Sequence, residues 1–112
     1  MSISSGAAAK GDPKFSAYAA SKSGVHALMA SLAAELGAHD ITCNVVAPGP
    51  VSTDMTASLG EKRLAELTEA VPLGRMASPD EIAGVVAFLA SADAAYITGA
   101  VIPVDGGLGM GH

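Results

Sequence analysis

The sequence is poor in several features that would otherwise define a fold or a partner. One of its 112 residues is a cysteine, Cys43, so no disulfide framework is available and we expect a reducing, cytoplasmic location. Lys and Arg number 6 against 11 Asp and Glu, and the net charge of -5 predicts no basic surface for nucleic acid or an anionic membrane. The longest apolar run, residues 82–90, is shorter than the ~20 residues of a membrane span.

Aromatic residues are also scarce, and small and aliphatic residues take their place. Half of the chain is hydrophobic and only 15% is charged, which is typical of a folding sequence with helices packed on a buried sheet. The histidines, His26, His39 and His112, lack metal-ligand spacing, so we predict no metal site. Cys43 lies within an apolar stretch and is expected to be a small buried residue.

The first half of the chain reads as strand, loop, helix and strand. Residues 1–5 are a strand stub, and a loop with glycine and proline follows. Residues 17–36 predict a helix that Ser16 caps and that ends with Gly37 in a left-handed conformation. Residues 41–49, rich in β-branched side chains, predict a buried strand. The helix has a core-facing stripe at Val25, Leu28, Met29, Leu32 and Leu36.

The second half predicts two helices and a last strand. After a loop over residues 50–60, residues 61–70 form a short amphipathic helix. Ser78, Pro79 and Glu81 then supply a cap, a proline at the first helical position and the third residue of a capping box, for a helix reaching about residue 91. Residues 100–107 form a strand that ends in two glycines. This alternation predicts an α/β fold with a parallel sheet.

Tyr18 and Lys22 stand four residues apart near the start of the first helix, in the stretch FSAYAASKSGV. Residues at this spacing lie on one face of a helix. A phenol has a pKa near ~10, and an ammonium group one turn away lowers it toward the range useful for a general acid or base. On spacing alone, an exposed tyrosine beside a solvated lysine remains the simpler interpretation.

Ser5 lies thirteen residues before Tyr18, where the first predicted strand ends. This serine, the gap, YAASK and the later NVVAPGPVSTDM together resemble the short-chain dehydrogenase/reductase family. The resemblance implies that Ser5 polarises the substrate carbonyl or hydroxyl and that Tyr18 transfers the proton. It implies that Lys22 tunes the tyrosine and holds the nicotinamide ribose. Ser4 is adjacent, and either serine is open to being an ordinary loop hydroxyl.

The stretch APGPVSTDM resembles the Pro-Gly loop of the same family, at the carboxyl end of the sheet. The resemblance implies that Gly49 lets the backbone approach the nicotinamide and that Val51 and Thr53 bind its carboxamide. The alternative is a plain strand terminator. The residues implied in cofactor binding are Tyr18, Lys22, Pro48, Gly49, Val51 and Thr53.

The segment after this loop resembles the mobile lid over the substrate, with Met55 and Leu59 as contacts or as ordinary helix-packing residues. Residues 75–107 resemble the C-terminal part of 3-oxoacyl-(acyl-carrier-protein) reductases. That likeness implies fatty acid biosynthesis, a small or acyl-carrier-bound carbonyl substrate, and NADP(H) as favoured cofactor with NAD(H) as the alternative. It implies a homotetramer for a full-length form. Tyr96 and Asp105 are expected to be structural.

The resemblance covers only the later half of a family member. GGLGMG closes the chain and opens no helix, so it is not a dinucleotide-binding turn. We interpret residues 1–112 as a single partial domain, the C-terminal half of a doubly wound Rossmann-type parallel sheet without its N-terminal nucleotide-binding half. The predicted function is NAD(P)H-dependent carbonyl reduction with Tyr18 as general acid. The alternatives are a truncated, inactive fragment or an association module that pairs with full-length subunits.

Overall fold

The computed structural model describes residues 2–3 and 16–109, with side chains from Ser23 onward except that of Met55. Strands and helices alternate along these residues, as the sequence predicts. In chain order they are β1 (Ser2–Ile3), α2 (Ser16–Leu36), the 3-10 turn η2 (Gly37–His39), β2 (Val45–Pro48), α3 (Asp54–Ala57), α4 (Glu61–Ala70), α5 (Pro79–Leu89), the 3-10 turn η3 (Ala92–Ala94) and β3 (Val101–Val104).

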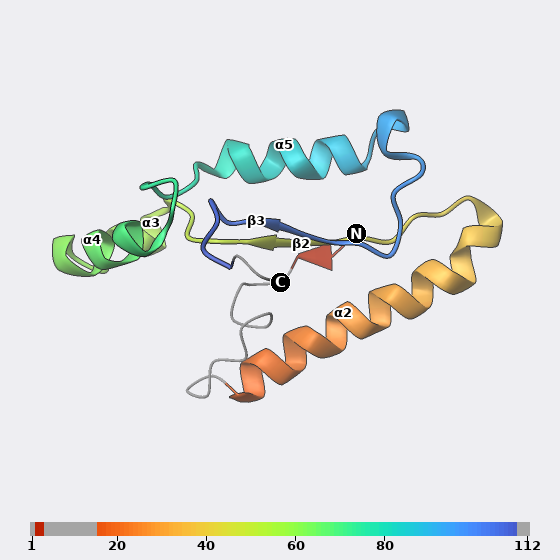
Figure 1. The fold of residues 1–112 in the computed structure, drawn as a ribbon, viewed down its shortest axis with the longest axis horizontal. Coiled ribbons are helices and arrows are strands. Elements are labelled where there is room, and N and C mark those ends of the chain that lie inside the picture. Colours follow the sequence, from red (N-terminus) through yellow and green to blue (C-terminus); the bar gives the residue numbers. More distant parts are fainter. Residues whose placement is uncertain (1, 4–15, 110–112) are drawn as a thin grey trace.

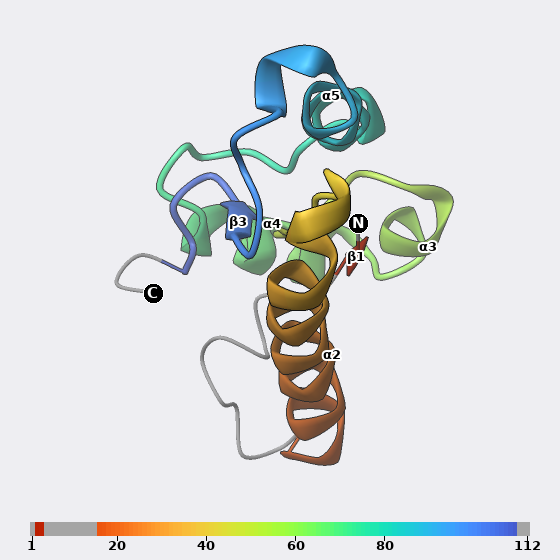
Figure 2. The same ribbon diagram turned by 90° about the vertical axis from the view of Figure 1, so that its right-hand side faces the viewer.

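The described strands form a parallel sheet in the order β1-β2-β3, which confirms the expected α/β class. Val46 pairs with Ile3 on one side and with Ile102 on the other. Helix α5 runs along one face of the sheet, and α2 lies on the opposite side (Figures 1 and 2). The short helices α3 and α4 lie beyond the carboxyl ends of β2 and β3 (Figure 1). Within the described ranges, no helix is long and apolar enough to cross a bilayer.

The core lies between the sheet and α5. Val46, Leu89 and Ala94 are buried there, because removing apolar side chains from water is the main gain in packing a helix on a sheet. Val45 is also buried and belongs to the other face, since successive strand residues point to opposite faces. Partly buried side chains around the core are Ile82, Val85, Val86, Ile97, Ile102 and Val104.

At the amino end of the sheet, a buried amide joins β2 to the segment before β3. Asn44 is 3% exposed; its Nδ2 donates to the Ile97 carbonyl at 3.0 Å, and its Oδ1 accepts from the Ala100 N–H at 3.1 Å. The Cys43 N–H donates to Thr98 Oγ1 at 3.0 Å, and the Cys43 side chain is buried as expected. These side-chain bonds add to two backbone bonds, from the Gly99 N–H to the Cys43 carbonyl and from the Val45 N–H to the Ala100 carbonyl, both of 2.8 Å. Strand β2 itself begins at Val45 and not at residue 41.

Helix α2 differs from prediction at its end and on its surface. Gly37 was expected to be left-handed, but it begins η2, and the left-handed residue is Asp40 with φ 59°. Aspartate tolerates this conformation better than most residues do, so the chain turns three residues later. Leu28, expected in the core, is 57% exposed, whereas Ala33 is buried. Figure 2 shows the reason: the first turns of α2 run away from the sheet.

The later helices follow the sequence closely. Helix α4 has the predicted bounds, and α5 begins after Ser78 with Pro79 in its first turn, as predicted. The loop over residues 50–60 contains a helical turn, α3, that the sequence pattern did not indicate. The last strand ends at Val104 because Asp105 starts a turn, and Pro103 is tolerated because β3 is an outer strand of the described sheet.

Candidate functional site

The predicted cofactor-binding loop lies at the carboxyl end of β2. Pro48 is the last residue of that strand and pairs with Val104 of β3. Gly49, Val51 and Thr53 follow at the edge of the sheet where open α/β folds bind their ligands. The structure therefore gathers four of the predicted site residues in one short segment.

Gly49 is required by the neighbouring strand end. Its N–H donates to the Val104 carbonyl at 3.0 Å. A Cβ placed on Gly49 would lie 2.8 Å from the Asp105 Cα and 2.9 Å from the Asp105 Cβ, closer than real Cβ atoms approach other atoms. The sequence-based reason for this glycine was an approach to nicotinamide, and the structure supplies a second reason within the protein itself.

Val51 is held between two segments. It forms an isolated parallel bridge with Ala77, in which the Ala77 N–H donates to the Pro50 carbonyl at 2.9 Å and the Ser52 N–H donates to the Ala77 carbonyl at 2.8 Å. The Val51 carbonyl accepts from Thr56 Oγ1 at 3.1 Å. The loop is thus fixed at its centre.

Thr53 serves as the N-cap of α3. Its N–H donates to Thr56 Oγ1 at 2.8 Å, and its own Oγ1 accepts from the Thr56 N–H at 3.4 Å. Because the Thr53 N–H is already used, a ligand contact by this residue would come from its hydroxyl hydrogen. Leu59, the predicted lid contact, lies between α3 and α4 and is exposed.

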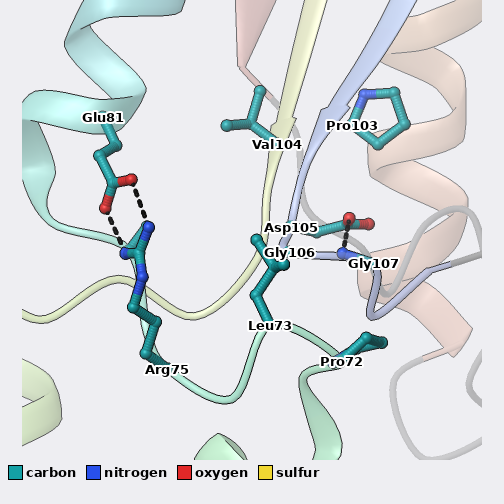
Figure 3. A pocket seen from close by; sticks show the side chains of 10 residues that line it. Pro72, Leu73, Arg75, Glu81, Pro103, Val104, Asp105, Gly106 and Gly107 are labelled. Carbon is teal, nitrogen blue, oxygen red and sulfur yellow. Dashed lines mark hydrogen bonds and ion pairs between the residues drawn. The ribbon is translucent and has the colours of Figure 1, made fainter.

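Arg75 and Glu81 form a bidentate ion pair (Figure 3). Arg75 Nη1 and Nη2 donate to Glu81 Oε1 and Oε2 at 2.6 and 2.8 Å, and Glu81 Oε1 also accepts from the Ser78 N–H at 3.0 Å. The hydrogen bonds from Arg75, and then that from the Ser78 backbone, lower the pKa of the Glu81 carboxyl to about 2. The same pairing raises the pKa of the Arg75 guanidinium.

Asp105 organises the turn after β3. Its carboxylate accepts from the Gly107 N–H at 3.0 Å and from the Gly109 N–H at 3.1 Å, which agrees with the structural role expected from the sequence. The carbonyl of Gly106, in the same turn, accepts from the Leu73 N–H at 3.1 Å. This turn therefore joins the end of β3 to the segment that leads to Arg75.

One hollow is lined in part by the loop, and a second lies beside the end of β3. One, of about 630 Å³, lies against α5 and is lined almost entirely by apolar groups. The other, of about 520 Å³, has Arg75 and Glu81 on one wall and the Asp105 turn on another (Figure 3). The lining of the first comprises Pro48, Val51, Thr53, Pro79, Ile82, Ala83, Val86 and Ala87.

The predicted proton-transfer residues are only partly within the described structure. Tyr18 and Lys22 both lie in α2, so their spacing of four places them on one helix face; their side chains are outside the described structure. Ser5 and the side chain of Met55 are also outside it. Among the described residues, no group of three His, Cys, Asp or Glu side chains is arranged to hold a metal ion.

Sequence reasoning missed the roles of Arg75 and Ala77 in this region. It assigned Glu81 to the helix cap, which is correct, but nothing in local periodicity links Glu81 to a residue six positions earlier. The only signal was the pair of opposite charges flanking a helix start. Bidentate pairing depends on how the turn before α5 folds, and this turn also contains Ala77, which forms the bridge to Val51.

Comparison with known proteins gives a clear family assignment. The family model that matches residues 1–109 is described as enoyl-(acyl carrier protein) reductase. The 3-oxoacyl-(acyl-carrier-protein) reductase MabA of Mycobacterium tuberculosis (strain ATCC 25618 / H37Rv) is 56% identical over 95 residues, which are 85% of this chain and 38% of the relative.

Two further relatives extend the range of named activities. The (3R)-3-hydroxyacyl-CoA dehydrogenase of Mus musculus is 52% identical over 93 residues, which are 83% of this chain and 36% of the relative. The 3-oxoacyl-(acyl-carrier-protein) reductase FabG of Pseudomonas aeruginosa is 46% identical over 110 residues, 98% of this chain and 44% of the relative. The chain thus spans about two fifths of the length of the curated relatives it matches.

Proposed function

Because the chain belongs to the short-chain dehydrogenase/reductase family, we propose that it carries the proton-transfer residues of an NAD(P)H-dependent carbonyl reductase acting on 3-oxoacyl thioesters. The observation that carries the proposal is the spacing of Tyr18 and Lys22 within one continuous helix, α2. The N-terminal end of that helix and the carboxyl ends of β2 and β3 point toward the same side of the molecule (Figure 1). That arrangement supports a shared site.

In the proposed mechanism, Tyr18 donates a proton to the carbonyl oxygen of the substrate as that oxygen becomes an alkoxide. The Lys22 ammonium, one helical turn away, favours the phenolate that remains and so makes the phenol a better acid. Ser5 donates a hydrogen bond to the same carbonyl oxygen, which orients it and stabilises the developing charge. A nicotinamide cofactor, when bound, supplies the hydride.

The loop after β2 fits the amide of such a cofactor. In a parallel pair, the two residues that flank a bridge residue form the hydrogen bonds to the partner segment. The N–H of the bridge residue between them then points away from that segment. Val51 is such a residue, and none of the described residues accepts from its N–H. The adjoining hollow, between the loop and α5, is apolar and open, which suits a flat ring. We propose that Val51 and Thr53 bind the carboxamide and that Pro48 and Gly49 line the ring, with NADP(H) favoured over NAD(H).

The remaining proposals concern partners. Two of the relatives described above are named as acyl-carrier-protein reductases, and one as a hydroxyacyl-CoA dehydrogenase. We therefore propose a carbonyl thioester as substrate, carried on acyl carrier protein or on a small thiol, in the cytoplasm. A homotetramer is proposed for a form of the length of these relatives.

The substrate class is tested in a chimera in which residues 1–112 replace the matching region of the mycobacterial relative. With acetoacetyl thioester, the chimera should oxidise NADPH, and NADH more slowly. The matched family model is described as an enoyl reductase, so crotonyl thioester is the necessary comparison. We expect a clear preference for the oxoacyl substrate. A preference for crotonyl thioester would contradict the proposal and favour enoyl reduction.

A further inference from the structure

Ala77 holds the centre of the ligand-binding loop through two hydrogen bonds on either side of Val51. The bridge is isolated, because it is not part of a longer ladder within the described structure. A single bridge lacks the neighbouring pairs that keep strands in register within a sheet, so its geometry depends on what fixes Ala77 itself. The residues before and after Ala77 therefore become important.

Glu81 reaches both sides of Ala77. Its carboxylate binds Arg75, two residues before Ala77, through two hydrogen bonds of 2.6 and 2.8 Å. The same carboxylate accepts from the N–H of Ser78, the residue after Ala77, at 3.0 Å. Arg75 Nη1 donates in addition to the Met76 carbonyl at 3.3 Å. Ala77 therefore lies within a short turn that the ion pair closes.

Bidentate pairing is well suited to holding a turn in one geometry. The planar guanidinium and carboxylate fix both distance and orientation, which a single point-charge contact does not do. The pair is also anchored to α5, because Glu81 lies in the first turn of that helix and α5 packs on the core. The packing of α5 on the core thus fixes Glu81, and Glu81 fixes Arg75. The turn between these two residues holds Ala77, which in turn bonds the residues on either side of Val51.

We propose that Arg75 and Glu81 are positioning residues for the loop, whose ion pair holds Ala77 in register with Val51 and so sets the direction of the Val51 N–H. The role in ligand binding rests on the proposed function, which assigns that N–H to the cofactor carboxamide. Neither side chain needs to touch the cofactor or the substrate. The competing explanation is that Glu81 only caps α5.

Two substitutions separate positioning from capping. Arg75→Gln removes the ion pair and leaves both Ser78 and Glu81 in place. Glu81→Gln also removes the pair, yet glutamine retains an oxygen that accepts the Ser78 N–H in a capping box. The matched control is Glu66→Gln, which breaks the exposed Arg63–Glu66 pair of 3.5 Å in α4.

Amide hydrogen exchange of the full chain gives the direct readout. The Ser52 and Ala77 amides donate the two bridge bonds, and both should exchange at least about threefold faster in Arg75→Gln and in Glu81→Gln. The Ala90 amide, which bonds the Val86 carbonyl at the end of α5, should be unchanged. Glu66→Gln should match the wild type at all three amides. Unchanged exchange at Ser52 and Ala77, or equal acceleration at Ala90, would overturn the positioning role.

Titration of the same proteins with NADPH tests the link to ligand binding. The Val51 amide resonance should shift in the wild type as NADPH is added. The NADPH concentration at half-saturation should rise about threefold or more in Arg75→Gln, at a temperature where both proteins are fully folded. Arg75→Lys, which keeps the charge, should recover part of the loss. Equal half-saturation in wild type and Arg75→Gln would contradict the inference. A wild type that binds neither NADPH nor NADH would instead overturn the proposed cofactor site, while the exchange data still decide the positioning role.

Discussion

At the scale of single residues, substitution of Gly49 and of Gly84 by alanine should change the free energy of unfolding in opposite directions. A Cβ on Gly49 would meet the Asp105 backbone at 2.8 Å, whereas a Cβ on Gly84 would meet nothing within 4 Å. Gly49→Ala should therefore lower the free energy of unfolding by about 1–3 kcal/mol through overpacking. Gly84→Ala, within α5, should raise it by about 0.5–1 kcal/mol because alanine favours the helix.

Urea unfolding of the two variants checks this expectation, with the wild type as reference. If the two variants had equal stability, the close approach of Gly49 to Asp105 would not exist in solution. A loss of stability in Gly49→Ala would also show that this glycine is required without any ligand. The sequence indicated a special glycine here, but its neighbour Asp105 is 56 residues away and no local pattern reveals that contact.

At the scale of elements, Glu81 links the stability of the α5 start to pH. Its carboxyl has an ordinary pKa of 4.5 and a pKa of about 2 in the fold. A lowered pKa in the folded state contributes stability that is complete above pH 4.5 and is lost as the pH falls from 4.5 toward 2. The wild type should thus be more stable than Glu81→Gln at neutral pH, and the difference should shrink across this range.

Urea unfolding from neutral pH down to about pH 2 measures that difference. Arg75→Gln should also show a reduced pH dependence, since it removes the main cause of the lowered pKa; a smaller part should remain, because the Ser78 N–H still bonds the Glu81 carboxylate. Because both side chains are exposed, added salt should narrow the gap further. A gap that stays constant from neutral to acid pH would show that the pair does not persist in solution.

The elements themselves show what local sequence can and cannot predict. The start of α5 was predictable because Ser78, Pro79 and Glu81 are local signals that act within one turn. The end of α2 was not, because Gly37 permits a left-handed conformation without requiring it, and the chain used Asp40. The bonds of Asn44 just before β2 were not predictable either, because its partners lie more than 50 residues away.

At the scale of the whole molecule, alternation of strands and helices predicted the parallel sheet, and the pairing of β2 with both neighbours confirms it. Burial on α2 was harder to predict. Its apolar stripe was expected in the core, yet Leu28 is exposed and α2 diverges from the sheet (Figure 2). Periodicity identifies the apolar face of a helix, but it does not show which turns of that helix will contact the sheet.

In the candidate site too, local motifs were predictable and tertiary contacts were not. The Pro-Gly loop and the Tyr18–Lys22 spacing were visible as short motifs. The support of the loop by Ala77, Arg75 and Asp105 was not, because it arises from segments that meet only in the folded chain. Motifs therefore indicated the loop after β2 as the candidate site, and tertiary contacts determine how that loop is held.

The central claim is that Tyr18 is the general acid, and its test compares the two tyrosines of the chain in the chimera described above. Tyr18→Phe should lower turnover of acetoacetyl thioester with NADPH by roughly 10²–10⁴-fold, the usual contribution of a positioned acid. Tyr96→Phe is the matched control, since Tyr96 is exposed and distant from the loop in sequence; it should keep the activity of the parent chimera. Equal turnover in the two variants would contradict the proposed function.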